Sequence, residues 1–146
     1  MVSQVEIQQY LTFMLAGEMY AVGILNVKEI IEYGQLTEIP MMPAFIRGVI
    51  NLRGKVIPVM DLRLKFGMPE LAYTQRTCII VTEIAGENAN IFIGAVVDGV
   101  SEVLNLTPAD IEDTPDFGGD VKTSALLGMA KVKGKVKILL DIDAVM

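Results

Sequence analysis

Apolar residues in this chain alternate with polar residues in short runs, a pattern typical of β-strands. Three pairs of such runs are each separated by a short turn that contains a glycine, which is hairpin spacing because glycine readily adopts positive φ. The paired runs are Tyr10–Leu15 with Met19–Ile24 around Gly17, Gly48–Arg53 with Lys55–Asp61 around Gly54, and Ala130–Lys133 with Lys135–Asp141 around Gly134. The pattern predicts three β-hairpins.

Helix is predicted to be a minor component. Val27–Ile31 has the length of one or two helical turns, and Leu62–Phe66 forms another candidate that Gly67 would close at a C-cap position. Residues 68–75 contain a proline and show no periodicity, so we interpret them as a hinge. Residues 111–122, with Pro115 and Gly118-Gly119, form a second predicted loop.

The chain repeats itself. Residues 46–62 return as residues 126–142, and five identical pairs coincide at one constant offset: Gly48/Gly128, Gly54/Gly134, Lys55/Lys135, Val56/Val136 and Asp61/Asp141. Upstream, residues 24–31 are echoed by residues 97–104, and Leu11–Phe13 by Ile79–Val81. Repetition on this scale indicates two similar halves related by a pseudo-two-fold axis.

Short strands with regular turn signals favour small barrels, which remove exposed sheet edges. We therefore predict an all-β fold of two barrels of about five strands each, with short helical turns. The first barrel is expected to span roughly residues 9–67 and the second roughly residues 76–142 of a single domain that covers residues 1–146.

Composition narrows the class of protein. Apolar residues make up 52% of the chain, which indicates a rich core together with an apolar surface that a partner covers. No apolar run approaches the roughly 20 residues of a membrane span, and the N-terminus lacks a signal-peptide pattern. The expected location is the cytoplasm. The net charge of −6, without a block of lysine and arginine, argues against nucleic acid as a partner.

The residues of common catalytic sites are missing. The absence of histidine removes His-based triads and most zinc sites, so we expect no metal and no cofactor. The Gly48–Lys55 and Gly128–Lys135 segments differ from phosphate loops in glycine spacing and lack the following Ser or Thr. Asp61 and Asp141 are interpreted as carboxylates that close turns. Cys78, the single cysteine, is interpreted as a small buried hydrophobe.

At residues 45–63, FIRGVINLRGKVIPVMDLR, the sequence resembles the CheW family of bacterial chemotaxis coupling proteins. The similarity extends over almost the whole chain. The resemblance implies a non-catalytic adaptor with two five-stranded Src-homology-3-like barrels, which joins the cytoplasmic tips of chemoreceptors to the histidine kinase CheA. The family supplies these partners, whereas the repeat and the missing chemistry only make an adaptor plausible.

The resemblance also implies three contact surfaces. In the family the receptor tip, a helical hairpin, lies in a groove between the barrels, and the matching positions are Val27, Glu29, Gly48, Arg53, Gly94 and Val100. The kinase contact is expected on the first barrel, around Leu36, Ile39, Met41 and Met42. A contact between copies in rings is expected at Asp116 and Phe117.

For each surface an ordinary structural role stays open at this stage. Arg53 could be a solvated turn residue, Gly48 and Gly94 ordinary strand glycines, the methionine-rich loop part of the core, and Phe117 a side chain tucked into its barrel. Two other functions also remain: the same module within a CheV-like or CheA-like protein, and a small-ligand-binding or enzymatic double barrel.

Overall fold

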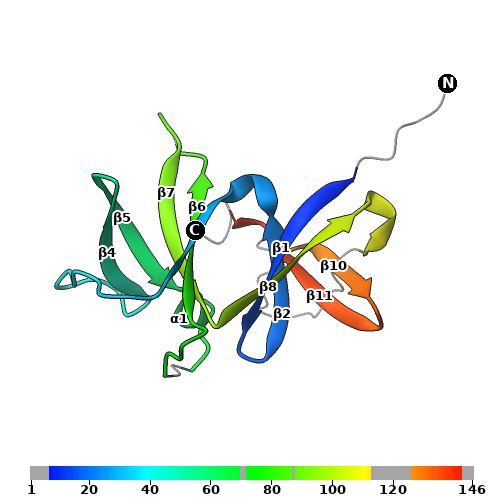
Figure 1. The fold of residues 1–146 in the computed structure, drawn as a ribbon, viewed down its shortest axis with the longest axis horizontal. Coiled ribbons are helices and arrows are strands. Elements are labelled where there is room, and N and C mark those ends of the chain that lie inside the picture. Colours follow the sequence, from blue (N-terminus) through cyan, green and yellow to red (C-terminus); the bar gives the residue numbers. More distant parts are fainter. Residues whose placement is uncertain (1–6, 70–71, 87, 113–125, 143–146) are drawn as a thin grey trace.

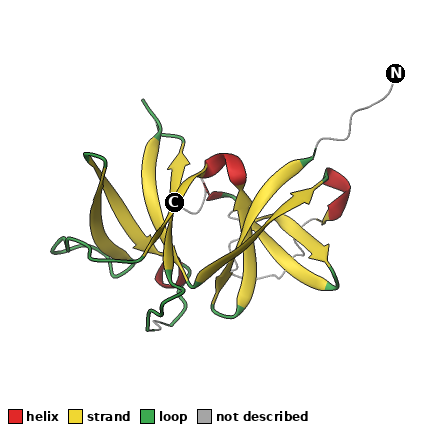
Figure 2. Cartoon of the chain, in the orientation of Figure 1, coloured by secondary structure: helices red, strands yellow, loops and turns green. Residues whose placement is uncertain are grey.

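The computed structural model describes residues 7–69, 72–86, 88–112 and 126–142, and most of this chain is strand (Figure 2). The strands are β1 (Gln8–Leu15), β2 (Glu18–Gly23), β3 (Val27–Glu32), β4 (Ile46–Leu52), β5 (Lys55–Asp61), β6 (Cys78–Ile84), β7 (Ile91–Val97), β8 (Gly99–Leu106), β9 (Ile111–Glu112), β10 (Leu126–Val132) and β11 (Lys135–Leu140). The short helices are η1 (Ile24–Asn26), α1 (Leu62–Lys65) and η2 (Pro108–Asp110). None of the described helices is long and apolar enough to cross a membrane.

The strands form two sheets, which lie side by side as two barrels (Figure 1). Barrel A has the strand order β8-β1-β2-β11-β10-β9, and barrel B has the order β3-β6-β7-β5-β4. The predicted all-β class with two barrels is therefore confirmed. The two-residue strand β9 has a counterpart in barrel B, where an isolated bridge joins Thr37 to Val49.

The predicted division of the chain between the barrels, at residues 9–67 and 76–142, is wrong. The hairpin β1–β2 belongs to barrel A together with β8 to β11, and barrel B is built from β3 to β7. The reason is that β2 pairs in parallel with β11, and β7 pairs in parallel with β5. The chain consequently crosses between the barrels twice, once from β2 to β3 and once from β7 to β8 (Figure 1).

The strand pairings support the pseudo-two-fold relation and correct one register. Val59 of β5 pairs with Gly94, and its repeat partner Leu139 of β11 pairs with Ala21. The pairings of the neighbouring strands then place Ile30 of β3 opposite Val103 of β8 in the superposed halves, which is the register predicted from the repeat. The match between β1 and β6 is shifted by one residue from the predicted one, so that Tyr10–Thr12 corresponds to Ile79–Val81.

The three predicted hairpins are present, and their turns explain the repeated glycines. In each turn a non-glycine residue with positive φ precedes a glycine with positive φ: Ala16 and Gly17, Arg53 and Gly54, Lys133 and Gly134. Two successive residues with positive φ form the type I′ turn, whose twist matches that of paired strands.

One helical prediction holds and the other is wrong. The segment after β5 forms α1, where the Asp61 carboxylate accepts a hydrogen bond from the Arg63 amide at 2.9 Å and Gly67 follows with φ of 77°. Asp61 thus caps a turn, as predicted. The segment Val27–Glu32 is instead an edge strand that pairs with β6. Its side chains alternate between half-buried and exposed, a two-residue period that favours a strand over a helix.

Both sheets are apolar on both faces, and their inner faces share one central core. This core contains Phe13, Leu15 and Val22 from barrel A and Ile80 and Val97 from barrel B, all at most 2% exposed. The opposite face of each sheet packs around a smaller cluster inside its own barrel. Cys78 lies in the central core, as predicted, and burial raises the pKa of its thiol.

The repeated glycines Gly48 and Gly128 allow two segments of backbone to approach closely. Both have positive φ, 148° and 150°, and both lie at an irregularity in strand register. A Cβ atom at Gly48 would overlap the Thr37 carbonyl oxygen, and one at Gly128 would lie 2.6 Å from the Glu112 carbonyl oxygen. Glycine is required at both positions by geometry and by the neighbouring backbone.

We expect Gly128→Ala to lower the free energy of unfolding by about 1–3 kcal/mol, because the added methyl group strains the backbone and displaces β9. Urea titration followed by circular dichroism measures this. Gly34→Ala is the matched control, since a Cβ there meets nothing within 4 Å and positive φ is absent. Equal stabilities of the two variants would contradict this account.

Candidate functional site

The predicted receptor residues Val27, Glu29 and Arg53 lie together at the seam of barrel B. Val27 and Glu29 lie on β3, which forms one edge of the sheet, and Arg53 lies in the turn beside β4, which forms the other edge. Arg53 Nη1 and Nη2 donate to the two carboxylate oxygens of Glu29 at 2.8 and 3.0 Å. This bidentate ion pair links the two edge strands of barrel B, β3 and β4, which are not paired with each other through backbone hydrogen bonds.

The Arg53 side chain is exposed although Glu29 binds both of its terminal nitrogens, Nη1 and Nη2. Its exposed fraction is 77%, against 25% for Glu29. Arg53 has φ of 51° at the tip of the hairpin, and it lines a pocket of about 180 Å³ together with Leu52, Ile57 and Phe92. Arg53 therefore holds Glu29 in position while its own side chain stays exposed to solvent.

Val100 occupies on β8 the place that Val27 occupies on β3. Each valine is half-buried and packs against the central core. Each also adjoins a β-bulge at which one extra residue is inserted into the edge strand. In the β8 bulge, the Thr12 hydroxyl forms hydrogen bonds with both backbone groups of Glu102. It donates to the Glu102 carbonyl at 2.7 Å and accepts from the Glu102 amide at 2.9 Å. The two valines thus mark the two crossings between barrels.

The predicted receptor residues Gly48 and Gly94 are buried, unlike the other four. Gly48 faces the Thr37 backbone, and a Cβ at Gly94 would lie 2.7 Å from the Ile79 Cγ2 atom and 3.3 Å from the Val59 Cγ2 atom. Both glycines permit close packing inside the protein. We expect them to influence a surface contact only through the shape of barrel B.

The four residues of the predicted kinase contact lie on the segment between β3 and β4. Met41 is fully exposed and has φ of 63°, while Ile39 and Met42 are 38% and 47% exposed and Leu36 is half-buried. An exposed apolar side chain on strained backbone gains nothing from the protein's own core. The prediction that this loop is not wholly buried is confirmed.

Beside this loop lies an open pocket of about 510 Å³. Leu36, Ile39 and Met42 line one side of it, and Arg47 and Tyr73 line another. The tyrosine comes from the segment that the sequence suggested as a hinge, and its ring centroid lies 4.3 Å from that of Tyr33. The pocket therefore combines apolar and aromatic groups with the oppositely charged side chains of Glu38 and Arg47.

Tyr73 is held by a buried polar network that sequence reasoning did not find. Arg47 Nε donates to the Tyr73 hydroxyl at 3.0 Å, and this hydroxyl donates to Asp61 Oδ2 at 2.6 Å. Burial raises the pKa of the Tyr73 phenol, and the hydrogen bond to Asp61 raises it further, so the hydroxyl keeps its proton and remains a donor. The Asp61 carboxylate is 1% exposed and also caps α1.

The network continues from α1 to the opposite barrel through Arg63, which is 3% exposed. Its guanidinium lies beside the Tyr73 ring at 5.9 Å and contacts Asp98 Oδ1 through Nε at 2.7 Å and Nη2 at 2.5 Å. Asp98 Oδ2 in turn accepts from the Ala16 amide of the β1–β2 turn at 2.8 Å. This ion pair ties α1 of barrel B to a hairpin of barrel A.

Removing one partner of this pair leaves a buried charge without compensation. We expect Asp98→Ala to lower the free energy of unfolding by about 3 kcal/mol or more. Glu83→Ala is the matched control, because its partner at 3.0 Å, Lys28, is exposed and is not left as a buried charge, so the loss should be less than about 1 kcal/mol. Urea titrations of both variants measure the difference, and a loss of stability no larger for Asp98→Ala than for Glu83→Ala would contradict the linking role of Arg63.

Within the described residues, no three metal-ligating side chains of the His, Cys, Asp or Glu type come together. Asp116 and Phe117, the predicted contact between copies, lie outside the described residues.

Comparisons with known proteins agree with the resemblance seen in the sequence. A family model described as CheW-like domain matches residues 9–146. Chemotaxis protein CheW of Klebsiella aerogenes is 41% identical over 136 residues, which cover 93% of this chain and 80% of that protein. Protein FrzA of Myxococcus xanthus is 33% identical over 127 residues, 87% of this chain and 76% of that protein.

A solved structure shows the same fold. The crystal structure of scaffolding protein TtCheW from Thermoanaerobacter tengcongensis superposes with a TM-score of 0.84 at 34% identity, covering 96% of this chain and 92% of that chain. The family model spans nearly the whole sequence, and both the curated relatives and this structure match over most of their length. The chain belongs to the CheW family.

Proposed function

We propose that this protein is a non-catalytic adaptor that couples the cytoplasmic tips of chemoreceptors to the histidine kinase CheA. The observation that carries the proposal is that two exposed surfaces lie at different places on one double barrel. One is the edge of barrel B with Val27, Glu29 and Arg53, and the other is the loop with Ile39 and Met41. Relatives named for chemotaxis and a structure titled a scaffolding protein support this role.

The receptor surface is proposed to consist of the two edge strands. Val27 and Val100 supply apolar contacts near the central core, and the Arg53–Glu29 pair supplies hydrogen-bonding groups at fixed positions. Gly48 and Gly94 support the shape of this surface from within barrel B. A docking helix can use such a surface because its apolar face packs on the valines while its polar residues reach the ion pair.

The kinase surface is proposed to be the loop with Leu36, Ile39, Met41 and Met42. Methionine side chains adapt their shape to a partner, and a fully exposed Met41 is available for such a contact. The neighbouring pocket with Tyr73 can accept an apolar side chain of the kinase. A contact between copies at Asp116 and Phe117 completes the proposed assembly. The protein is expected to act in the cytoplasm, recruited to receptor arrays.

Reconstitution tests the function as a whole. Membranes that contain a chemoreceptor are sedimented with CheA in the presence and absence of this protein. We expect the kinase to sediment, and its activity to respond to the receptor ligand, only when the protein is present. Failure of the wild-type protein to sediment with receptor membranes, in an assay where a known CheW succeeds, would overturn the proposal.

Arg53→His should keep the fold and the binding of CheA but weaken receptor binding. Histidine cannot donate two parallel hydrogen bonds to Glu29. Loss of a central contact of this kind costs on the order of 2 kcal/mol, about thirtyfold in affinity. Fluorescence anisotropy with a receptor cytoplasmic fragment measures this loss.

Lys133→His is the control for this variant. Lys133 is the counterpart of Arg53 in the repeat, has φ of 53° in the equivalent turn and is exposed. It should bind the receptor fragment like the wild type. Equal affinity of Arg53→His and the wild type would show that Arg53 is only a solvated turn residue.

Met41→Ser should weaken binding of the CheA regulatory domain by about tenfold, equivalent to about 1.4 kcal/mol, without lowering the free energy of unfolding. The side chain makes no core contact that could be lost, since it is fully exposed. Isothermal titration calorimetry measures the affinity. Val136→Ser, at a 47% exposed position of barrel A, is the control and should bind the kinase normally. The kinase surface lies elsewhere if both variants bind alike.

A further inference from the structure

The hairpin β10–β11 carries four lysines at alternate positions, which are Lys131, Lys133, Lys135 and Lys137. They are one third of the 12 basic residues in a chain whose net charge is −6. Because valine and glycine separate them, they form no continuous basic run in the sequence. Within the described part of the chain, none of the four forms an ion pair or a side-chain hydrogen bond. This hairpin is therefore a positively charged surface without internal compensation.

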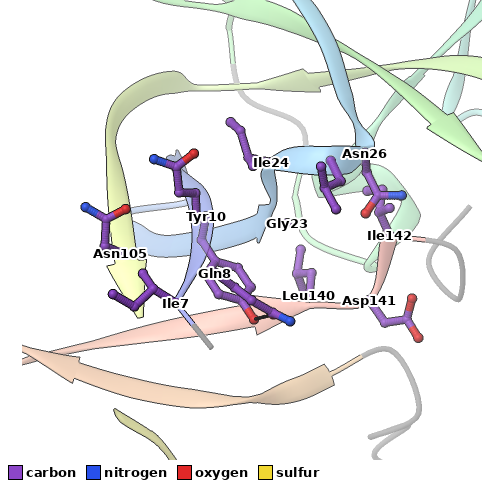
Figure 3. Close-up of a pocket in the computed structure, with 12 residues that line it drawn as sticks. Ile7, Gln8, Tyr10, Gly23, Ile24, Asn26, Asn105, Leu140, Asp141 and Ile142 are labelled. Atoms are coloured by element: carbon purple, nitrogen blue, oxygen red, sulfur yellow. Dashed lines mark hydrogen bonds between the residues drawn. The ribbon is translucent and has the colours of Figure 1, made fainter. Parts of the chain in front are cut away.

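The positive charge is confined to one end of barrel A. In Figure 1 the hairpin, drawn in orange, lies on the side of barrel A that faces away from barrel B. At the other end of β11, Figure 3 shows Leu140, Asp141 and Ile142 among residues of which none is basic. A charge concentrated on a few adjacent residues favours a local contact with an oppositely charged group.

Lys137 differs from the other three lysines because its side chain lies inside barrel A. It is only 7% exposed. Leu139, two residues later on β11, and Ala130, which pairs with Lys137, both belong to the core of this barrel. Residues two apart on a strand share a face, so Lys137 shares the inner face with Leu139. Its Nζ atom keeps contact with solvent, since Arg63 Nη1 is the only fully enclosed side-chain atom without a partner among the described residues.

The fold itself does not require a lysine at this position. The repeat counterpart of Lys137 is Ile57, which is 3% exposed and packs inside barrel B. Ile57 pairs with Ile50, whereas Lys137 pairs with the smaller Ala130, which leaves room for the lysine stem. Burial of an ammonium group without a partner costs free energy, while burial of isoleucine stabilises a barrel. An anion bound from outside explains this lysine better than packing does.

The counterpart hairpin β4–β5 uses its cations within the protein. Arg53 is bound by Glu29, and Lys55 Nζ lies 4.4 Å from the centroid of the Phe92 ring. In barrel A the place of Phe92 is taken by Met19, which offers no aromatic face to a cation. The lysines of β10–β11 thus lack the internal partners of their counterparts and remain available to a ligand.

The arrangement favours a short acidic segment over a long polyanion. Lys137 presents one ammonium group at the mouth of barrel A, while Lys133 and Lys135 lie in the turn and at the start of β11. One carboxylate can reach Lys137 while its neighbours pair with the flanking lysines. A nucleic acid or an anionic membrane extends beyond the hairpin and is repelled by the acidic remainder of the chain. A segment of a few residues interacts mainly with charges within the Debye length of about 8 Å.

We propose that Lys133, Lys135 and Lys137 at the mouth of barrel A form a docking site for a short segment rich in aspartate and glutamate from a partner protein. Lys137 binds one carboxylate at the barrel mouth, and Lys133 and Lys135 bind its neighbours. The three lysines are separate from the residues of the proposed receptor and kinase surfaces. The docking site therefore stands or falls independently of the proposed function.

Binding of a fluorescent hexaglutamate peptide at low ionic strength tests this site. We expect saturable binding to the wild-type protein that weakens as salt is added, and no binding of hexaglutamine. Lys137→Met, which removes the ammonium group and keeps an unbranched side chain, should bind about tenfold more weakly. Lys65→Met is the matched control, because it removes the same charge from an exposed position on α1. It should bind within about twofold of the wild type.

The stability of the free protein provides a second measurement. Lys137→Met should keep or raise the free energy of unfolding, because the substitution removes a nearly buried charge that has no partner among the described residues. Hexaglutamate should raise the melting temperature of the wild type but not of this variant.

Three results would overturn the docking site: no saturable binding of hexaglutamate, equal weakening by Lys137→Met and Lys65→Met, or a marked loss of stability in Lys137→Met. Anionic vesicles and duplex DNA are tested in parallel. If either binds more tightly than hexaglutamate and loses this binding in Lys137→Met, the occupant is not an acidic protein segment and the proposal fails.

Discussion

The shared central core is the constraint on which the rest of this structure depends. Adjacent residues in the inner strands face different cores: Leu139 packs inside barrel A and Leu140 in the central core, and Ile79 and Ile80 do the same in barrel B. A sheet that is apolar on both faces cannot be stable alone, because one face would be left in water. The two barrels therefore form together, and the 52% apolar composition is largely explained by this double burial.

Burial of both faces leaves only edges, hairpin turns and loops for contact with other proteins. The edge strands β3 and β8 are both interrupted by bulges, which limit their pairing with strands of other chains. The seam of barrel B is closed by the Arg53–Glu29 pair, and its far edge is covered by the bridge between Thr37 and Val49. Of the candidate contact residues, Glu29 and Arg53 lie at the seam of barrel B, and Met41 lies on the loop before β4. The Arg63–Asp98 ion pair then holds α1 of barrel B against a hairpin of barrel A.

Local features of the fold were predictable from the sequence. The turns around Gly54 and Gly134 are set by two successive residues with positive φ. The helix cap is set by the Asp61 carboxylate, which accepts a hydrogen bond from the backbone amide two residues later. Barrel membership was not predictable in this way. It depends on the parallel pairings of β2 with β11 and of β5 with β7. Parallel strands are not joined by a short turn, so turn residues cannot predict which parallel strands are neighbours.

In the candidate site, too, some features could be predicted from the sequence and others depend on contacts between distant residues. The places of Glu29 and Arg53 came from resemblance to a family, and the structure adds their ion pair. The network through Tyr73 joins residues far apart in the chain, and Tyr73 itself stands in a segment without periodicity, so no spacing pattern could reveal it.

The differences between the two halves carry more functional information than their similarities. Residues required by backbone geometry are the same in both halves, such as Gly48 with Gly128 and Gly54 with Gly134. The exposed residues of the two equivalent turns differ: Arg53 is bound to Glu29, whereas the counterpart pair, Lys133 and Glu102, forms no ion pair among the described residues. A perfectly symmetric double barrel would present the same surface twice and bind one kind of partner. In this chain Arg53 and Lys133 break the symmetry at two equivalent turns, so the ion pair with Glu29 at the seam of barrel B has no counterpart among the described residues of barrel A.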